Sequence, residues 1–194
     1  MPDYSWAERE DWESAWQPLI DAIGTDFAPD EVTWGIEVIE KGIIRRYLEP
    51  IEFDAPLHYD EAVAKKHGYA GIIAPYSGLA TWTTVGVWSP GQDPVYLSDG
   101  RNDLPRSSRT MVKMPGPDTN GGFATDVEYE YLRPFVLGDR VGTRGRKLLS
   151  VLPKQTSVGR GAFSTTESEI VNQDMEVIAV QRLSTYGYVA MKRS

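Results

Sequence analysis

The chain has 194 residues, of which 41% are hydrophobic, and this suffices for the core of one domain. Its formal net charge of -8 argues against nucleic acid as a partner, because phosphate binding needs a concentrated basic surface. The chain has no cysteine, so disulfides, thiolate metal sites and cysteine nucleophiles are excluded.

The first residues, MPDYSWAERED, are acidic and interrupted by polar groups, unlike a signal or transit peptide. No apolar run in the chain reaches about 18 residues, the length of a membrane-spanning helix. We therefore expect a cytoplasmic protein that has no membrane partner.

Residues 5 to 23 are predicted to form an amphipathic helix. Ser5 and Glu8 have the spacing of a capping box, and Gly24 is a natural helix end. One face of this helix carries apolar side chains, namely Trp12, Trp16, Leu19, Ile20 and Ile23. We expect residues 1–30 to form a helical extension that docks this face onto the domain or onto another subunit.

The next elements surround the first of the two histidines. Residues 32–39 are predicted to form a strand or an extended segment that leads into the next helix. A short helix over residues 41–51 is expected to end near Pro50, because proline lacks the N–H that a helix interior requires. The turn that follows delivers His58 to the start of a second helix, residues 59–68.

Residues 68–71 predict a loop, and residues 75–88 predict a longer apolar helix that a sheet would enclose. Pro75 suits its first position, and Gly78 leaves room for close packing. The first N–H groups of this helix, near Tyr76 and Ser77, would lack intrahelical acceptors. They are therefore candidates to hold a carbonyl oxygen or an oxyanion.

The rest of the chain predicts a long excursion followed by strands. Residues 89–122 are rich in proline, glycine and polar residues without periodicity. Val127, Tyr129 and Tyr131 then alternate with acidic residues, which predicts a strand with one buried face. Three more strands are predicted over residues 140–152, 158–172 and 176–189. One helix enclosed by consecutive antiparallel strands is an α+β architecture.

Three segments carry a resemblance to a known family. They are PLH at Pro56–His58, GYAGIIAP at Gly68–Pro75 and EYLRPFVLGDRV at Glu130–Val141. These segments resemble the MaoC-like dehydratase and (R)-specific enoyl-CoA hydratase family, which adds or removes water across the C2–C3 bond of acyl-CoA thioesters. The resemblance implies a single hot-dog domain over residues 31–194, in which an antiparallel sheet wraps a central helix. It also implies an acyl-CoA substrate and no cofactor.

One position departs from the family pattern. The family's hydratases place an aspartate five residues before the histidine, where this chain has Phe53. This loss is similar to the amino-terminal, FAS1-type dehydratase halves of the family, which pair with a second hot-dog that carries the aspartate and the histidine. The resemblance therefore implies that the chain is the supporting half of a hetero-oligomeric hydro-lyase.

Two alternatives stay open. In the first, a homodimeric hydratase uses His58 with Asp54 or Glu52, the residues that flank Phe53. Adjacent residues in an extended segment point to opposite sides, so this pairing would need a rebuilt turn. In the second, the chain binds an acyl thioester without transforming it. His58 is then a turn histidine kept for packing rather than a general acid or base.

Further residues are candidates for substrate binding, and none is a candidate for metal binding. Basic side chains could attract the CoA phosphates, namely Arg45, Arg46, Lys65, Lys66, Arg106 and Arg109. Trp82 is a candidate for an aromatic wall of the acyl pocket. His58 and His67 lie nine residues apart without carboxylates at ligand spacing, so we predict no metal site.

Overall fold

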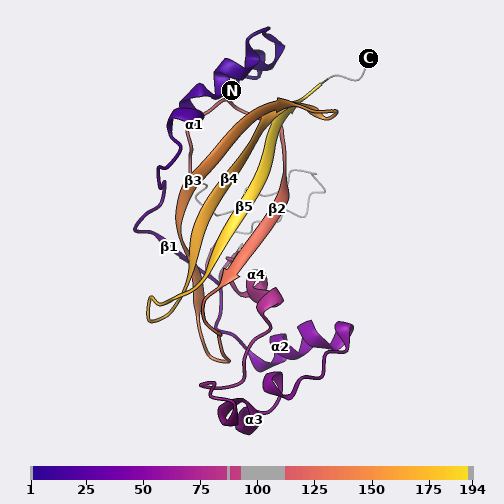
Figure 1. The fold of residues 1–194 in the computed structure, drawn as a ribbon, viewed down its shortest axis with the longest axis vertical. Coiled ribbons are helices and arrows are strands. Elements are labelled where there is room, and N and C mark those ends of the chain that lie inside the picture. Colours follow the sequence, from indigo (N-terminus) through magenta and orange to yellow (C-terminus); the bar gives the residue numbers. More distant parts are fainter. Residues whose placement is uncertain (1, 87, 93–111, 192–194) are drawn as a thin grey trace.

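A five-stranded antiparallel sheet organises the chain. The computed structural model describes residues 2–86, 88–92 and 112–191, so most of the predicted excursion lies outside the description. The strands lie in the order β1-β3-β4-β5-β2. Their bounds are β1 Val32–Trp34, β2 Gly121–Tyr131, β3 Val141–Gln155, β4 Gly159–Asn172 and β5 Val177–Ala190. Figure 1 shows a long curved sheet with helices gathered at one end and the amino-terminal segment at the other.

The three long strands β3, β4 and β5 lie where strands were predicted, and their bounds differ from the predicted ones by no more than three residues. A side chain fixes the turn between β4 and β5. Asn172 Oδ1 accepts hydrogen bonds from the backbone N–H of Asp174 at 3.0 Å and of Glu176 at 2.9 Å. An asparagine at this position can replace backbone acceptors in a tight turn, so the polar NQD sequence ends one strand and begins the next.

Three short helices lie at one end of the sheet, namely α2 (Lys41–Leu48), α3 (Glu61–Lys66) and α4 (Leu79–Trp82). Helix α2 ends before a 3₁₀ turn that contains Pro50, as predicted. Asp60 caps α3, because its Oδ1 accepts from the N–H of Ala62 at 2.8 Å. No helix within the described ranges is long and apolar enough to cross a membrane.

The central helix is much shorter than predicted. Among the described residues of the predicted range 75–88, only the 3₁₀ turn Tyr76–Gly78 and α4 are helical. The Thr84 hydroxyl donates to the Ala80 carbonyl at 2.9 Å, and Thr83 donates to the same carbonyl at 3.3 Å. These β-branched residues compete for backbone acceptors and pack poorly in a continuing helix, so the helix ends there.

Helix α4 nevertheless occupies the core position that was expected. Leu79 and Trp82 pack in the main hydrophobic cluster with Val141 of β3 and Ile170 of β4. Gly35 follows β1 where the chain passes the helix. A Cβ at Gly35 would lie 1.8 Å from the Trp82 carbonyl oxygen, so only glycine permits this approach.

The predicted helix over residues 5–23 is wrong as a continuous element. The segment forms 3₁₀ turns at Ser5–Glu8 and Trp12–Trp16, followed by α1 (Gln17–Asp21). A continuous helix would place Pro18 in its interior, where the ring clashes with the preceding turn; here Pro18 lies in the first turn of α1. No side-chain hydrogen bond caps the first turn, so the capping box is absent.

The amino-terminal extension packs on the sheet. Trp6, Trp12 and Trp16 are buried in a second cluster with Leu148 of β3 and Ala162 of β4. Figure 1 shows this extension at the end of the sheet opposite α2 and α3. Of the predicted docking face, Trp12, Trp16 and Leu19 are buried, but Ile23 is 44% exposed. The boundary near residue 30 stays a prediction.

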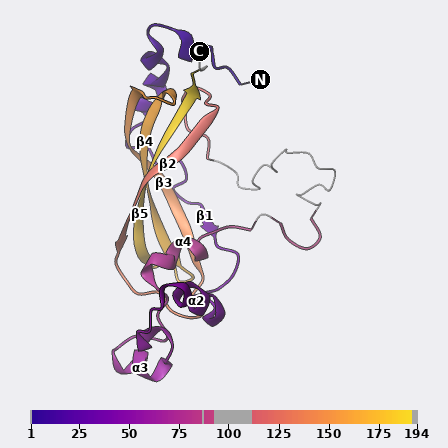
Figure 2. The ribbon, with the colours of Figure 1, turned by 90° about the vertical axis from the view of Figure 1, so that its right-hand side faces the viewer.

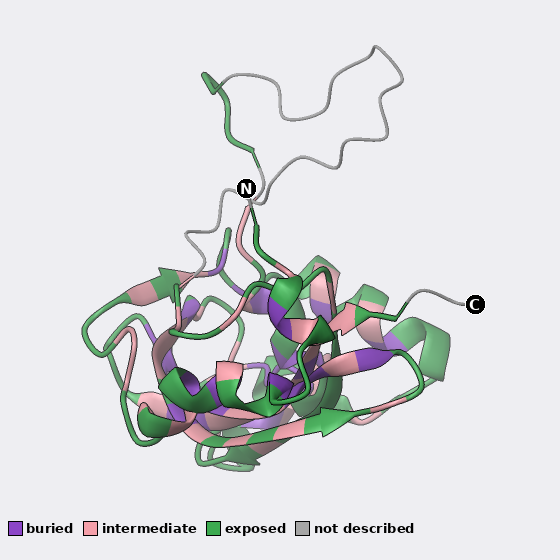
Figure 3. Cartoon of the chain, turned by 90° about the horizontal axis from the view of Figure 1, so that it is seen from above, coloured by how far each residue is buried: buried purple, intermediate pink, exposed green. Residues whose placement is uncertain are grey.

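Strand β2 is more exposed than its alternation predicted. Tyr129 is partly buried, but Val127 is 45% exposed and Tyr131 is 36% exposed. Within the described residues β2 pairs only with β5, so it forms an edge of the sheet. Figure 3 shows buried and exposed residues interspersed along the strands. A strand at the edge of an antiparallel sheet can have an alternating sequence although its apolar side chains are only partly buried.

Candidate functional site

A cavity of about 440 Å³ lies where the end of α2, the His58 turn and strand β2 meet. Residues from four separate segments of the chain line it. They are Leu48, Ile51, Phe53, His58, Ile73, Pro75, Tyr76, Ser77 and Tyr131. Most of this lining is apolar, and the volume falls within the range of small-molecule sites.

His58 is fixed in this cavity by its backbone and by its ring. Pro56 opens a 3₁₀ turn, and the His58 N–H donates to the Ala55 carbonyl at 3.1 Å. The ring Nδ1 lies 2.7 Å from the Ile73 carbonyl oxygen. A carbonyl oxygen can only accept, so Nδ1 carries the proton in this contact.

Phe53 occupies the space beside the His58 ring. The two ring centroids are 5.5 Å apart with an interplanar angle of 56°. The Phe53 side chain is 47% exposed and contributes an apolar surface to the cavity. No carboxylate lines the cavity among the described residues.

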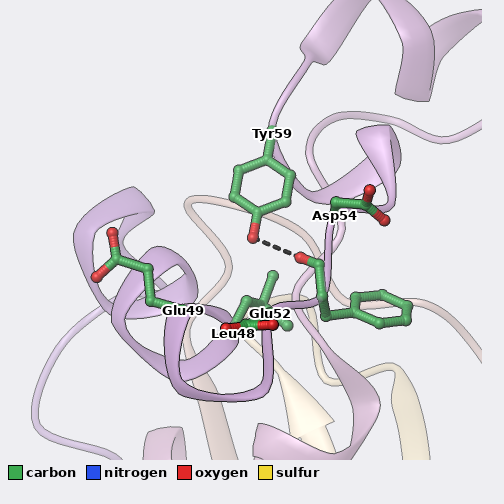
Figure 4. Close-up of a pocket in the computed structure, with 6 residues that line it drawn as sticks. Leu48, Glu49, Glu52, Asp54 and Tyr59 are labelled. Atoms are coloured by element: carbon green, nitrogen blue, oxygen red, sulfur yellow. Dashed lines mark hydrogen bonds between the residues drawn. The ribbon is translucent and has the colours of Figure 1, made fainter.

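A second pocket of about 380 Å³ lies next to the first and shares Leu48 and Phe53 with it. Its remaining lining residues are Glu49, Glu52, Asp54 and Tyr59. The Tyr59 hydroxyl donates to the Phe53 carbonyl at 2.7 Å, as drawn in Figure 4. In that view the Asp54 carboxylate points away from the Glu49 side of the pocket.

The two candidate carboxylates therefore do not share a cavity with the histidine. Glu52 and Asp54 line the second pocket, and His58 lines the first. Glu52 adopts a left-handed backbone conformation with φ of 51°, which is uncommon for a residue other than glycine. The pairing of His58 with either carboxylate remains a prediction, and the present geometry does not bring the groups together.

Tyr76 and Ser77 both line the His58 cavity. Pro75 caps the turn rather than entering it, and the first hydrogen bond of the turn runs from the Gly78 N–H to the Pro75 carbonyl at 2.9 Å. The N–H groups of Tyr76 and Ser77 precede that bond, as the oxyanion prediction requires. Their role stays a prediction.

Tyr131 was predicted as a strand residue and not as a site residue, yet it lines the cavity on the β2 side. Its hydroxyl donates to the Tyr76 carbonyl at 2.8 Å, and the two rings lie 4.8 Å apart. Partial burial raises the pKa of both tyrosines, so both hydroxyls stay protonated at neutral pH. Tyr131 is the last residue of an alternating strand, which is the one sequence signal that could have identified it.

The predicted CoA-binding cations have different surroundings. Arg45 lies 2.6 Å from the Glu49 carboxylate, which raises the pKa of Arg45. Lys65 lies 2.6 Å from Glu61 on the same face of α3. Arg46 and Lys66 are exposed. Arg106 and Arg109 lie outside the described residues.

Trp82 is a core residue in this structure. Its side chain is 5% exposed and packs edge-on against Phe135 at 6.0 Å. It lines neither of the two pockets. The described ranges contain no group of three or more histidine, aspartate or glutamate side chains placed to hold a metal ion.

Solved structures with the same fold identify the architecture. The ChsH1-ChsH2 complex from Mycobacterium tuberculosis includes a chain with a TM-score of 0.61 at 20% identity, with 94% of each chain covered. A MaoC-like dehydratase from Rhodospirillum rubrum has a TM-score of 0.53 at 20% identity, with 85% of this chain and 95% of that chain covered. The short helix enclosed by the antiparallel sheet is therefore a hot-dog fold, which confirms the predicted α+β class.

Residues 21–181 match the family model described as the FAS1-like, dehydratase domain region. The chain belongs to this family of MaoC-like hydratases and dehydratases, which confirms the family resemblance. A curated relative from Thermomonospora curvata, the probable enoyl-CoA hydratase alpha subunit, is 30% identical over 149 residues. That alignment covers 76% of this chain and 44% of the relative, so the chain spans less than half the length of that protein.

Proposed function

We propose that the chain is the supporting half of a MaoC-like enoyl-CoA hydratase or 3-hydroxyacyl-CoA dehydratase, and that a second hot-dog subunit supplies the complete aspartate and histidine pair. The packing of Phe53 against the His58 ring carries this proposal. An apolar ring occupies the position beside the histidine where a second polar group would be needed.

The chemistry explains why one group is not enough. Hydration of an enoyl thioester adds a hydroxyl to C3 and a proton to C2. One group must therefore take a proton from the attacking water, and a proton must reach C2 as the C2–C3 double bond is lost. His58 can transfer one proton, but the cavity has no carboxylate to orient the water beside it. The chain alone is therefore expected to hydrate enoyl thioesters slowly.

The cavity is nevertheless suited to hold the acyl part of a thioester. Leu48, Ile51 and Phe53 provide apolar walls, and the N–H groups of Tyr76 and Ser77 begin a helical turn beside them. Of the predicted CoA-binding cations, Arg46 and Lys66 are exposed and have no ion pair among the described residues, so they remain available to the CoA phosphates.

The names of two related proteins support a partner subunit. The Thermomonospora curvata relative is named an alpha subunit. The Mycobacterium tuberculosis structure is a complex of two components, ChsH1 and ChsH2. We extend the same arrangement to this chain, with a partner whose cavity contains both an aspartate and a histidine.

A reconstitution assay tests the proposal. The full chain is purified from its own source under native conditions, the mass of the assembly is determined, and crotonyl-CoA hydration is measured for the assembly and for the separated chain. Weak hydration by the chain and strong hydration by the assembly are expected. Strong hydration by the chain alone that His58→Ala abolishes would support the homodimeric alternative with Asp54 or Glu52.

The absence of a carboxylate in the His58 cavity also favours a second function, acyl-thioester binding without chemistry. In that case a saturated acyl-CoA binds the chain, and no assembly that contains the chain hydrates crotonyl-CoA. Calorimetric titration with butyryl-CoA measures the binding. Absence of binding to both the chain and its assembly would exclude this function.

A further inference from the structure

The amino-terminal extension contacts the residues that lead into strand β2. The Trp6 indole N–H donates to the Asp118 carbonyl at 2.9 Å, and the Asp3 backbone N–H donates to the Asp118 carboxylate at 2.9 Å. Met114 packs against the cluster that contains the three tryptophans. The extension is therefore attached to the chain just before β2 begins at Gly121.

The extension is also attached to strand β4. One guanidinium nitrogen of Arg160 donates to the Ala7 carbonyl at 2.9 Å and to the Arg9 carbonyl at 3.0 Å. The same guanidinium lies 5.7 Å from the centroid of the Trp12 ring. Arg160 belongs to β4, and in the described sheet β5 separates β4 from β2. The extension thus connects two strands that are not neighbours.

The first residues of β2 contribute little to their own position. The strand begins with Gly121 and Gly122, which have no side chains to pack against the neighbouring strand. A Cβ at Gly121 would lie 2.5 Å from the Tyr188 ring, so glycine is required there. A bulge between Ala124 and Asp126 then interrupts the pairing with β5. Because glycine-rich strands specify their register weakly, the start of this edge strand needs support from outside the strand.

We propose that residues 2–21 form a strap that holds the amino-terminal end of β2 on the sheet. Arg160 fixes the strap to β4, and Asp118 fixes it to the residues before β2. Between these attachments, the buried tryptophans of the strap pack against Leu148 of β3 and Ala162 of β4. Release of either attachment should therefore loosen the start of β2. This role is conformational and does not depend on the proposed hydratase assembly.

The expected size of the effect follows from the contacts that remain. The Asn120 N–H donates to the Tyr188 carbonyl at 3.1 Å, and the Asn120 Oδ1 accepts from the Ala190 N–H at 3.0 Å. Both contacts join the start of β2 to β5 without the strap, so loss of one attachment should open β2 only in part. One hydrogen bond corresponds to about 2-fold to about 10-fold in an opening equilibrium.

Amide hydrogen exchange of the full chain tests the strap, because local opening accelerates exchange without global unfolding. In Trp6→Phe, which keeps an aromatic ring but cannot donate to Asp118, the amides of residues 121–124 should exchange about 2-fold to about 10-fold faster. Arg160→Met should accelerate the same amides by at least as much, although its site lies on β4. Exchange at the paired residues Val141 and Asn172 should not change.

Two variants provide matched controls. Trp16→Phe makes the same change in the same cluster, but the Trp16 indole N–H is buried without an acceptor in the described structure, so no hydrogen bond is lost. Arg144→Met removes a strand arginine that pairs with Glu169 instead of the extension. Both controls should leave exchange of residues 121–124 as in the unaltered chain.

Three results would overturn the strap. The first is equal acceleration in Trp6→Phe and Trp16→Phe, which would trace the effect to the smaller ring. The second is acceleration in Trp6→Phe without acceleration in Arg160→Met, because a strap must act from both of its attachments. The third is uniform acceleration in all strands, because the proposed strap acts on β2 and not on the whole sheet.

Discussion

The two neighbouring pockets share Leu48 and Phe53 but offer opposite chemistry. The His58 cavity has mostly apolar walls and a single imidazole, whereas the second pocket has the carboxylates of Glu49, Glu52 and Asp54. The Phe53 segment runs between them, with its carbonyl held by Tyr59. Glu52 and Asp54 are the sequence neighbours of Phe53, but they line the second pocket and not the His58 cavity. Adjacency to Phe53 in the sequence therefore does not place a carboxylate beside His58.

This difference also bears on the direction from which a ligand approaches. The phosphates of CoA are anionic, and three carboxylates beside one pocket repel them. The Arg45 guanidinium offsets part of this charge through Glu49. The acyl group is therefore expected in the His58 cavity, with the CoA phosphates outside the carboxylate pocket.

Phe53→Asp should have the largest effect, because it introduces a carboxylate into the wall of the His58 cavity. Paired acid and base groups contribute about 100-fold to about 10,000-fold in rate, so crotonyl-CoA hydration by the isolated chain should rise by at least about 100-fold. Phe53→Asn is the control, because the asparagine side chain has the shape of aspartate but cannot act as a base. An equal rise in both variants, or in neither, would contradict the assignment of Phe53 as the missing catalytic position.

Leu48→Ala tests whether the wall shared by the two pockets is structural. Leu48 is almost fully buried, so its truncation should reduce the free energy of unfolding by about 2–5 kcal/mol. Urea denaturation measures this change. Leu152→Ala, at an exposed position on β3, should cost less than about 1 kcal/mol. Similar losses in the two variants would show that Leu48 does not support the pockets.

Ile51→Asp places a charge in the apolar wall of the His58 cavity. Ile51 lines the His58 cavity and is 60% exposed, so the fold should tolerate the change. A carboxylate in this wall should weaken butyryl-CoA binding by about 10-fold or more, because it must lose water when the acyl group binds. Calorimetry measures the dissociation constant. Ile23→Asp, outside both pockets, should leave it unchanged, and an equal loss there would indicate a nonspecific charge effect.

Tyr131→Phe should have the smallest effect. It removes the hydroxyl that donates to the Tyr76 carbonyl and leaves the ring contact intact. The expected loss of unfolding free energy is about 0.5–1.5 kcal/mol. Tyr188→Phe is the control, because the described chain offers its hydroxyl no partner. Thermal unfolding of the two variants should separate them, and equal unfolding temperatures would refute a contribution from this hydrogen bond.

The strands and the His58 turn were predictable because their signals are local. Strand-forming runs bounded by turn residues predicted β3, β4 and β5, and Pro50 predicted the end of α2. The amino-terminal segment is less helical than its apolar spacing predicts, because Pro18 cannot lie in the interior of a continuous helix. The central helix was overestimated because Thr83 and Thr84 favour hydrogen bonds to the preceding turn.

The site was predictable only in part. His58, Tyr76 and Ser77 were identified as candidates, and the structure brings all three into one cavity. Tyr131 comes from a strand 73 residues after His58, and no local pattern relates two residues so far apart in the chain. Trp82 was proposed as a pocket wall from residue type alone, which does not distinguish a cavity wall from the core.

The most direct test of the supporting role is crotonyl-CoA hydration by the reconstituted assembly that carries His58→Ala in this chain, compared with the assembly whose partner histidine is changed to alanine. If this chain supports the site without transferring protons, the first assembly should keep its kcat within about 10-fold, and the second should lose at least about 100-fold. The opposite pattern, with activity lost through His58 and retained without the partner histidine, would contradict the account.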